Sequence, residues 1–252
     1  ITIPNSVKTI THYAFLNCTS LKTVHITDLE SWCKIARTES YDGSGYSAFT
    51  SDWHLFLNGE EIKDLIIPNT ITTIESAAFS GCIGLTNVTI PNTITTIGSE
   101  AFRGCTGLAS ITIPNSVTAI GASAFSGCTS LTNVNIPNSV TRIENYTFAD
   151  CCGLTSITIP NTVTVIAWLA FSGCTSLTNL AIPNSVTTIG RGAFNRCTGL
   201  TNITIPNSVT TIGEQAFYGC TGLTSITVEA TEPPVAREAF DYDGQIYNNA
   251  TL

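Results

Sequence analysis

Residues 200–222 read LTNITIPNSVTTIGEQAFYGCTG, and the chain repeats this stretch with small edits along most of its length. The spacing of proline, cysteine and phenylalanine shows that the period is 23 residues. The prolines of the series are Pro68, Pro91, Pro114, Pro137, Pro160, Pro183 and Pro206. The cysteines are Cys82, Cys105, Cys128, Cys151, Cys174, Cys197 and Cys220, and the phenylalanines are Phe79, Phe102, Phe125, Phe148, Phe171, Phe194 and Phe217. A fixed period of this length is the signature of a solenoid.

Each repeat divides into a strand and a turn. In LTNITIP, apolar Leu200, Ile203 and Ile205 are separated by polar residues, a pattern that indicates a half-buried strand. Pro206 ends the strand because it has no N–H to donate. The segment from Gly213 to Tyr218 is expected to form a short helical or 3₁₀ turn that fills the coil. The prediction is a single domain over 1–252, an α/β leucine-rich-repeat solenoid of about ten coils with a parallel sheet on its strand face.

The repeat pattern LTxITIPNSVTxIGxxAFxGC resembles the BspA-type leucine-rich repeat of bacterial and protozoan surface proteins. The resemblance covers nearly the whole chain. It implies a curved, right-handed array of coils, a cell-surface or secreted location, and adhesion to host or neighbouring-cell surface or matrix proteins or glycans.

Two places interrupt the period. Pro4 and Pro68 are separated by one repeat plus an insertion, predicted to span residues 28–64. There, DLESWCKIA is typical of a short helix capped by Asp28, and Asn58–Gly59 predicts a β-hairpin. The BspA-type family shows a similar arrangement, which implies an ordered insertion. Residues 229–252 lack the expected proline and predict a degenerate C-terminal capping coil.

The composition excludes several classes of function. The net charge is −8 and only 11 % of residues are charged, with no basic stripe, which disfavours nucleic acid and anionic membranes as partners. No apolar run has the roughly 20 residues of a spanning helix, so direct membrane insertion is not expected. The chain has no methionine and begins inside a repeat, which indicates a processed product or a fragment.

The cysteines predict a column of thiols. Cys18 and the seven cysteines of the series share one repeat position and should stack inside the coils. Parallel neighbours suit disulfide geometry poorly, so reduced thiols are favoured over disulfides. Cys33 and Cys152 lie outside the register, and their state is left open.

No catalytic, cofactor-binding or metal-ligating set is expected. His12, His25 and His54 have no patterned nucleophile or acid partner, and the acids Asp42, Asp52, Glu60, Glu61 and Asp64 lack a calcium-loop pattern. The pair Cys151–Cys152 lacks zinc-ligand spacing. Threonine columns that include Thr86, Thr89, Thr155 and Thr158 raise the alternative of ice or crystal binding. Ala109, Asn135 and Ala181 interrupt these columns, which favours ordinary exposed-strand threonines.

The candidate interaction surface is where the repeats differ most, just before the Ala–Phe pair. Tyr146, Trp168, Leu169 and Arg191 fall there on three consecutive coils, and aromatic residues with arginine are typical of interface hot spots. The alternative is that Trp168 packs over the convex edge near Phe171. Aromatics of the insertion, among them Trp32, Tyr41, Tyr46, Phe49, Trp53 and Phe56, are a second candidate or a small local core.

Two functions therefore stay open. The first is a non-enzymatic binding module, adhesin-like by resemblance. The second is a structural spacer that presents another domain, a role favoured by the near-identity of the coils.

Overall fold

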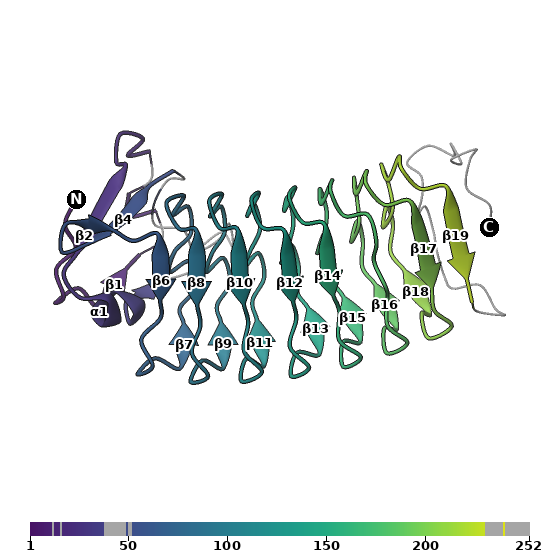
Figure 1. The fold of residues 1–252 in the computed structure, drawn as a ribbon, viewed down its shortest axis with the longest axis horizontal. Coiled ribbons are helices and arrows are strands. Elements are labelled where there is room, and N and C mark those ends of the chain that lie inside the picture. Colours follow the sequence, from purple (N-terminus) through teal and green to yellow (C-terminus); the bar gives the residue numbers. More distant parts are fainter. Residues whose placement is uncertain (12, 16, 38–48, 50–51, 230–238, 240–252) are drawn as a thin grey trace.

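The computed structural model describes residues 1–11, 13–15, 17–37, 49, 52–229 and 239. They form an elongated array of coils, with the N-terminus at one end and strand β19 (Ser225–Val228) at the other (Figure 1). Within the predicted insertion at 28–64, residues 38–48, 50 and 51, with Tyr41, Asp42 and Tyr46, lie outside the described residues, and so does His12. The predicted cap at 229–252 is likewise outside them, apart from Glu229 and Ala239.

Two columns of short parallel strands run along the array. The first column contains β6 (Asp64–Ile66), β8 (Asn87–Thr89), β10 (Ser110–Thr112), β12 (Asn133–Asn135), β14 (Ser156–Thr158), β17 (Asn202–Ile205) and β19. The second column contains β1 (Thr9–Ile10), β3 (Ala36–Arg37), β7 (Thr73–Ile74), β9 (Thr96–Ile97), β11 (Ala119–Ile120), β13 (Arg142–Ile143), β15 (Val165–Ile166), β16 (Thr188–Ile189) and β18 (Thr211–Ile212). The described residues form about nine coils, against about ten predicted for the whole chain.

The strand register follows the sequence period. Ile111 pairs with Val88, and Thr112 pairs with Thr89, so equivalent residues of neighbouring coils lie side by side. Val88 and Ile111 are buried, whereas Thr89 and Thr112 are exposed, as the period-two alternation predicts. Between β14 and β17 one coil contributes only a bridge at Ala181. Ala181 stands where most coils carry threonine, and alanine has the weaker strand propensity.

Neither column is continuous between β10 and β12 or between β11 and β13. The interruption falls where Glu144 replaces a glycine. A Cβ on the equivalent Gly121 would lie 2.4 Å from Ser99 N of the preceding coil. Gly121 N–H donates to Ile97 O, but within residues 52–229 the corresponding bond from Glu144 is missing. A long side chain at this position therefore coincides with the break in the second column.

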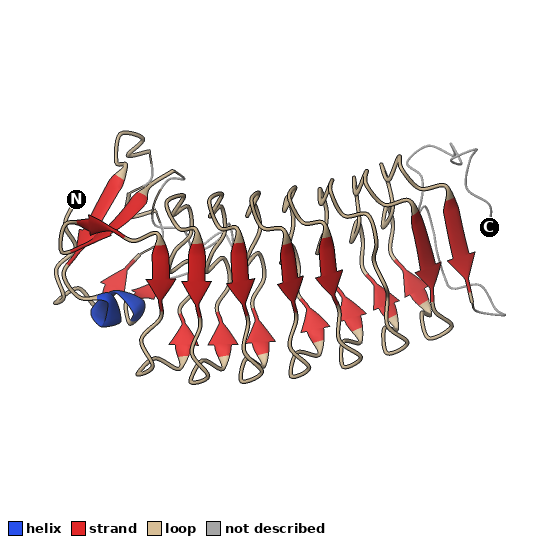
Figure 2. Cartoon of the chain, in the orientation of Figure 1, coloured by secondary structure: helices blue, strands red, loops and turns tan. Residues whose placement is uncertain are grey.

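The prediction of a short helical or 3₁₀ turn before the cysteine of each coil is wrong. The segment is a run of turns, and α1 (Leu29–Cys33) is the only helix among the described residues (Figure 2). Alternate N–H groups bond within the coil and to the next coil: Ala78 N–H donates to Glu75 O, and Phe79 N–H donates to Ala101 O. Ala77 and Gly81 have positive φ angles of 52° and 78°. These left-handed residues prevent a right-handed helix from forming.

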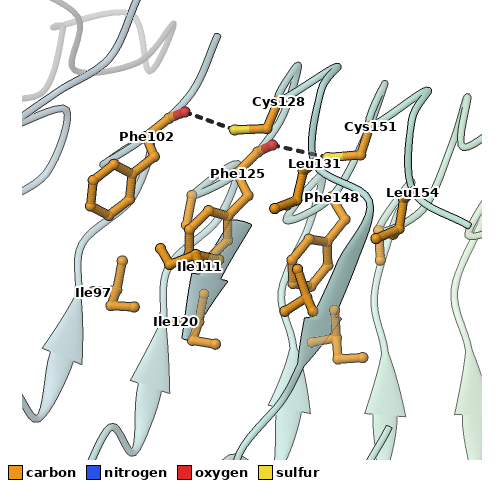
Figure 3. Packing of buried hydrophobic residues seen from close by; sticks show 14 of the residues in the cluster. Ile97, Phe102, Ile111, Ile120, Phe125, Cys128, Leu131, Phe148, Cys151 and Leu154 are labelled. Atoms are coloured by element: carbon orange, nitrogen blue, oxygen red, sulfur yellow. Dashed lines mark hydrogen bonds between the residues drawn. The ribbon is translucent and has the colours of Figure 1, made fainter. Parts of the chain in front are cut away.

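The phenylalanine and cysteine series build the core (Figure 3). The seven phenylalanine rings are fully buried and stack in order, with neighbouring centroids 5.3 to 5.6 Å apart. The cysteines are free, and each from Cys105 to Cys220 donates its S–H to a phenylalanine carbonyl of the preceding coil. Cys128 Sγ, for example, lies 3.2 Å from Phe102 O. The thiols thus satisfy a buried carbonyl as well as filling space.

Cys18 does not join this column, contrary to the prediction, because it is exposed. The coil that follows it is the insertion, which supplies no cysteine neighbour. In its place, Trp53 of the insertion pairs with Cys82. Of the two cysteines left open, Cys33 is free and buried, and Cys152 is free and exposed.

Thiol reactivity should separate the two groups of cysteines. Burial raises the pKa of the Cys33 and Cys82 thiols to about 12, so their reactive thiolates are scarce at neutral pH. We expect a short iodoacetamide pulse on the native protein to label Cys18 and Cys152 rapidly. The other described cysteines should be labelled only after unfolding. Peptide mass spectrometry reads the result, and rapid native labelling of Cys128 would contradict it.

The insertion is ordered where it is described. Asp28 caps α1 by accepting hydrogen bonds from Glu30 N and Ser31 N, as predicted. Strand β2 (Thr23–Ile26) pairs in parallel with β4 (His54–Leu57), and β4 pairs antiparallel with β5 (Glu60–Glu61) around Asn58–Gly59. The predicted hairpin is therefore confirmed.

A buried aromatic cluster joins the insertion to the array. Trp53 lies 6.1 Å from Trp32 and 5.2 Å from Phe49 between ring centroids, and its Nε1 donates to Ser80 O at 2.8 Å. Arg37 is buried over the Trp32 ring at 4.7 Å and donates to Ala78 O. Burial lowers the pKa of Arg37 to about 10, so it stays charged at neutral pH. These contacts fix the insertion against the first regular coil.

Candidate functional site

The four residues of the candidate surface occupy the turns that follow the second column. Tyr146 follows β13, Trp168 and Leu169 follow β15, and Arg191 follows β16. The backbone ladder links them: Tyr146 N–H donates to Trp168 O, and Leu169 N–H donates to Arg191 O, both at 2.9 Å. The structure therefore brings residues of three consecutive coils to one side of the array.

Trp168 is the most prominent member of this surface. It is 43 % exposed, and its ring meets Tyr146 edge-on with centroids 5.0 Å apart. Its backbone N–H donates to Asn145 Oδ1 at 3.1 Å, which anchors the turn. Desolvation raises the pKa of Tyr146, with a smaller opposite effect of Arg191. The Tyr146 hydroxyl is thus a protonated donor at neutral pH.

Leu169 depends on a glycine that the sequence did not single out as functional. Leu169 adopts a positive φ of 53°, which a bulky residue rarely does. A Cβ on Gly192 would lie 2.6 Å from Leu169 Cδ2, so the leucine side chain lies over the glycine. The sequence signal for this contact was Gly192 itself, because other coils carry Glu100, Ser123 or Gln215 at the same repeat position.

Arg191 extends the surface towards the next coil. Its Nε is 3.8 Å from Glu214 Oε2, and both side chains are more than half exposed. An exposed pair of this kind contributes little stability. The guanidinium therefore remains available to a partner. We call Tyr146, Trp168, Leu169 and Arg191 the Trp168 patch.

The other sequence candidates have structural surroundings of their own. His25 stacks on Phe56 at 4.8 Å, and His54 Nδ1 contacts Glu61 Oε1. Among the described residues, no three His, Cys, Asp or Glu side chains gather as a metal site. The hydroxyls of Thr86, Thr155 and Thr224 each donate to a carbonyl of the preceding coil. The hydrogen-bond donors of these threonines are therefore already used within the protein.

A hollow of about 380 Å³ crosses the turns on the N-terminal half of the array. It is lined by Phe49, Ser80, Gly81, Arg103, Gly104, Ser126, Gly127 and Asp150. Over the described part of the chain, no helix has the length and apolar character needed to cross a membrane.

The geometry defines a leucine-rich-repeat solenoid whose repeat is interrupted by aromatic residues at the Trp168 patch. The BspA type Leucine rich repeat region matches residues 1–37, 52–177 and 141–248 in six copies. The chain belongs to this family.

Solved structures agree with this assignment. A leucine-rich repeat protein from Bacteroides ovatus is 30 % identical with a TM-score of 0.67, covering 91 % of this chain and 55 % of its own. This chain thus spans little more than half of that protein. The T. pallidum Leucine Rich Repeat protein is 31 % identical, with a TM-score of 0.52 and coverage of 66 % and 71 %. A Eubacterium ventriosum protein, 24 % identical over 96 % of this chain and 68 % of its own, shares the fold with a TM-score of 0.67. Among curated proteins, none matches the chain.

Proposed function

We propose that the chain is a non-enzymatic recognition module of a cell-surface or secreted protein, and that the Trp168 patch contacts the partner. The observation that carries the proposal is the half-exposed Trp168, which stands where the two preceding coils carry Ala122 and Asn145. Membership of the BspA-type family supports the surface location and an adhesin-like role. The expected partners are surface or matrix proteins, or glycans, of a host or neighbouring cell.

The composition of the patch supports a contact role. Tryptophan, tyrosine and arginine are the residues that most often carry binding energy at protein interfaces. Trp168 and Tyr146 already contact one another, and the ladder fixes their backbones. Little conformational entropy would be lost on binding, because the patch is pre-organised.

A structural spacer is the second candidate, and one observation favours it. The phenylalanine stack and the thiol column continue from coil to coil with almost constant geometry. An array selected only to separate two domains would need no more than this regularity. The two functions differ in whether the exposed departures from the repeat bind anything.

A solid-phase panel of matrix proteins and glycans distinguishes the two. We expect saturable binding to one class of ligand. Trp168→Ala should weaken it by more than about thirtyfold, since a hot-spot tryptophan contributes 2 kcal/mol or more. The control is Arg103→Ala, which removes an exposed arginine paired with Glu100 away from the patch. No saturable binding from a folded sample would favour the spacer.

A further inference from the structure

The outward face of the β2–β4–β5 sheet also departs from the repeat. His25 pairs with Phe56, and Phe56 pairs with Glu61, so the three side chains form one row across the sheet. We call these three residues the hairpin row. From β8 onward the regular coils carry small or polar residues at the corresponding outward position, whereas β6 carries the exposed Ile66 there. These residues are Thr89, Thr112, Asn135, Thr158, Ala181, Thr204 and Thr227.

Phe56 is not part of the buried aromatic cluster. Strand alternation places Leu55 in the core, where it is fully buried, and turns Phe56 to the opposite face. There Phe56 is half-buried and stacks on His25, with an angle of 24° between the rings. Trp32 and Trp53, by contrast, are almost completely buried. The Phe56 ring is therefore available on the surface without being needed in the core.

The segment that carries Phe56 and Glu61 is predominantly negative. From Asp52 to Asp64 the sequence carries four acids, Asp52, Glu60, Glu61 and Asp64, against one lysine, Lys63, for a net charge of −3. Residues 65–228 contain five acidic residues and four arginines, so the rest of the array is nearly neutral. The contact between His54 Nδ1 and Glu61 Oε1 holds one carboxylate beside Phe56. Asp52, Glu60 and Asp64 are exposed.

We infer that the hairpin row docks a basic, extended segment of a partner protein. A lysine or arginine of that segment lies over the Phe56 ring and within reach of the Glu61 carboxylate. Aromatic faces attract cations, and acidic surroundings steer a basic segment towards the surface. This inference does not rest on the Trp168 patch, which lies on later coils.

A labelled ten-residue peptide of alternating lysine and threonine tests the inference by fluorescence anisotropy with the full chain. We expect binding that weakens with added salt, because exposed charges are screened. The double variant Phe56→Thr, Glu61→Gln should bind roughly tenfold more weakly, a loss of about 1.4 kcal/mol. Phe56→Tyr keeps the ring and should bind as the parent does. An otherwise identical peptide of glutamate and threonine should not bind.

Trp168→Ala is the matched control, since it removes an exposed aromatic elsewhere and should leave peptide binding unchanged. Because Phe56 lies outside the core, Phe56→Thr should melt close to the parent. Equal binding by the parent and the double variant would overturn the inference. So would equal binding of the glutamate peptide, absence of binding by the parent, or loss of binding in Trp168→Ala.

Discussion

Replacing Phe125 with alanine should lower the free energy of unfolding by about 3 to 5 kcal/mol, the usual cost of removing a buried phenylalanine. Phe125 is fully buried and stacks between Phe102 and Phe148, at 5.6 Å from each. The cavity cannot close easily, because the ladder bonds fix the spacing of the coils on both sides. Chemical denaturation followed by circular dichroism measures the loss.

The position of Phe125 adds a second expectation. A solenoid is stabilised by contacts between neighbouring coils, so a defect in the middle can separate the array into two cooperative units. The denaturation curve of Phe125→Ala should therefore broaden as well as shift. Thr112→Ala, on an exposed strand position of an adjacent segment, is the control and should change stability by less than about 0.5 kcal/mol. A Phe125→Ala protein as stable as this control would contradict the proposed core.

Trp53→Ala should cost a similar amount, about 3 to 5 kcal/mol, but act at the junction with the insertion. The indole is 1 % exposed, packs on Phe49 and Trp32, and donates to Ser80 O. Its loss should loosen the insertion while the later coils remain folded. Limited proteolysis should then cleave residues 28–64 faster, with little change beyond Leu85.

Trp53→Phe separates packing from hydrogen bonding. It keeps an aromatic ring but leaves the Ser80 carbonyl without its donor, and should cost about 1 to 3 kcal/mol. If the protease cleaved residues 28–64 of Trp53→Ala no faster than those of the parent, Trp53 would not fix the junction.

The sequence specified the architecture because its signals recur in every coil. The 23-residue spacing placed Phe125 beside Phe102 and Phe148, and Asn58–Gly59 placed the hairpin. The second strand column was not predicted, because two-residue strands such as β11 are too short to show alternation.

The turn conformation was predicted wrongly for a related reason. Its first left-handed position is occupied by residues such as Ala77, Tyr146 and Leu169, none of which signals positive φ as glycine does. The inter-coil hydrogen bonds select that conformation, and they are tertiary contacts. The prediction that Cys18 is buried was wrong for the same reason. Cys18 has the right repeat position but lacks the neighbours that would bury it.

The proximity of the candidate residues followed from the period, whereas their detailed setting did not. Tyr146 and Trp168 are almost one repeat apart, so their contact could be expected on neighbouring coils. The fit of Leu169 over Gly192 depends on side-chain direction within a left-handed turn. The period alone contains no such information.

The most direct test of the account restores the repeat at the patch. The variant Tyr146→Ser, Trp168→Ala, Leu169→Ser, Arg191→Ala carries residues like Ala122 and Ser123 of a preceding coil. Its binding to the panel ligand of the parent is measured together with its melting temperature. The account predicts a folded array that melts within a few degrees of the parent and no longer binds. Undiminished binding by this folded variant would contradict the claim that function lies where the repeat is broken.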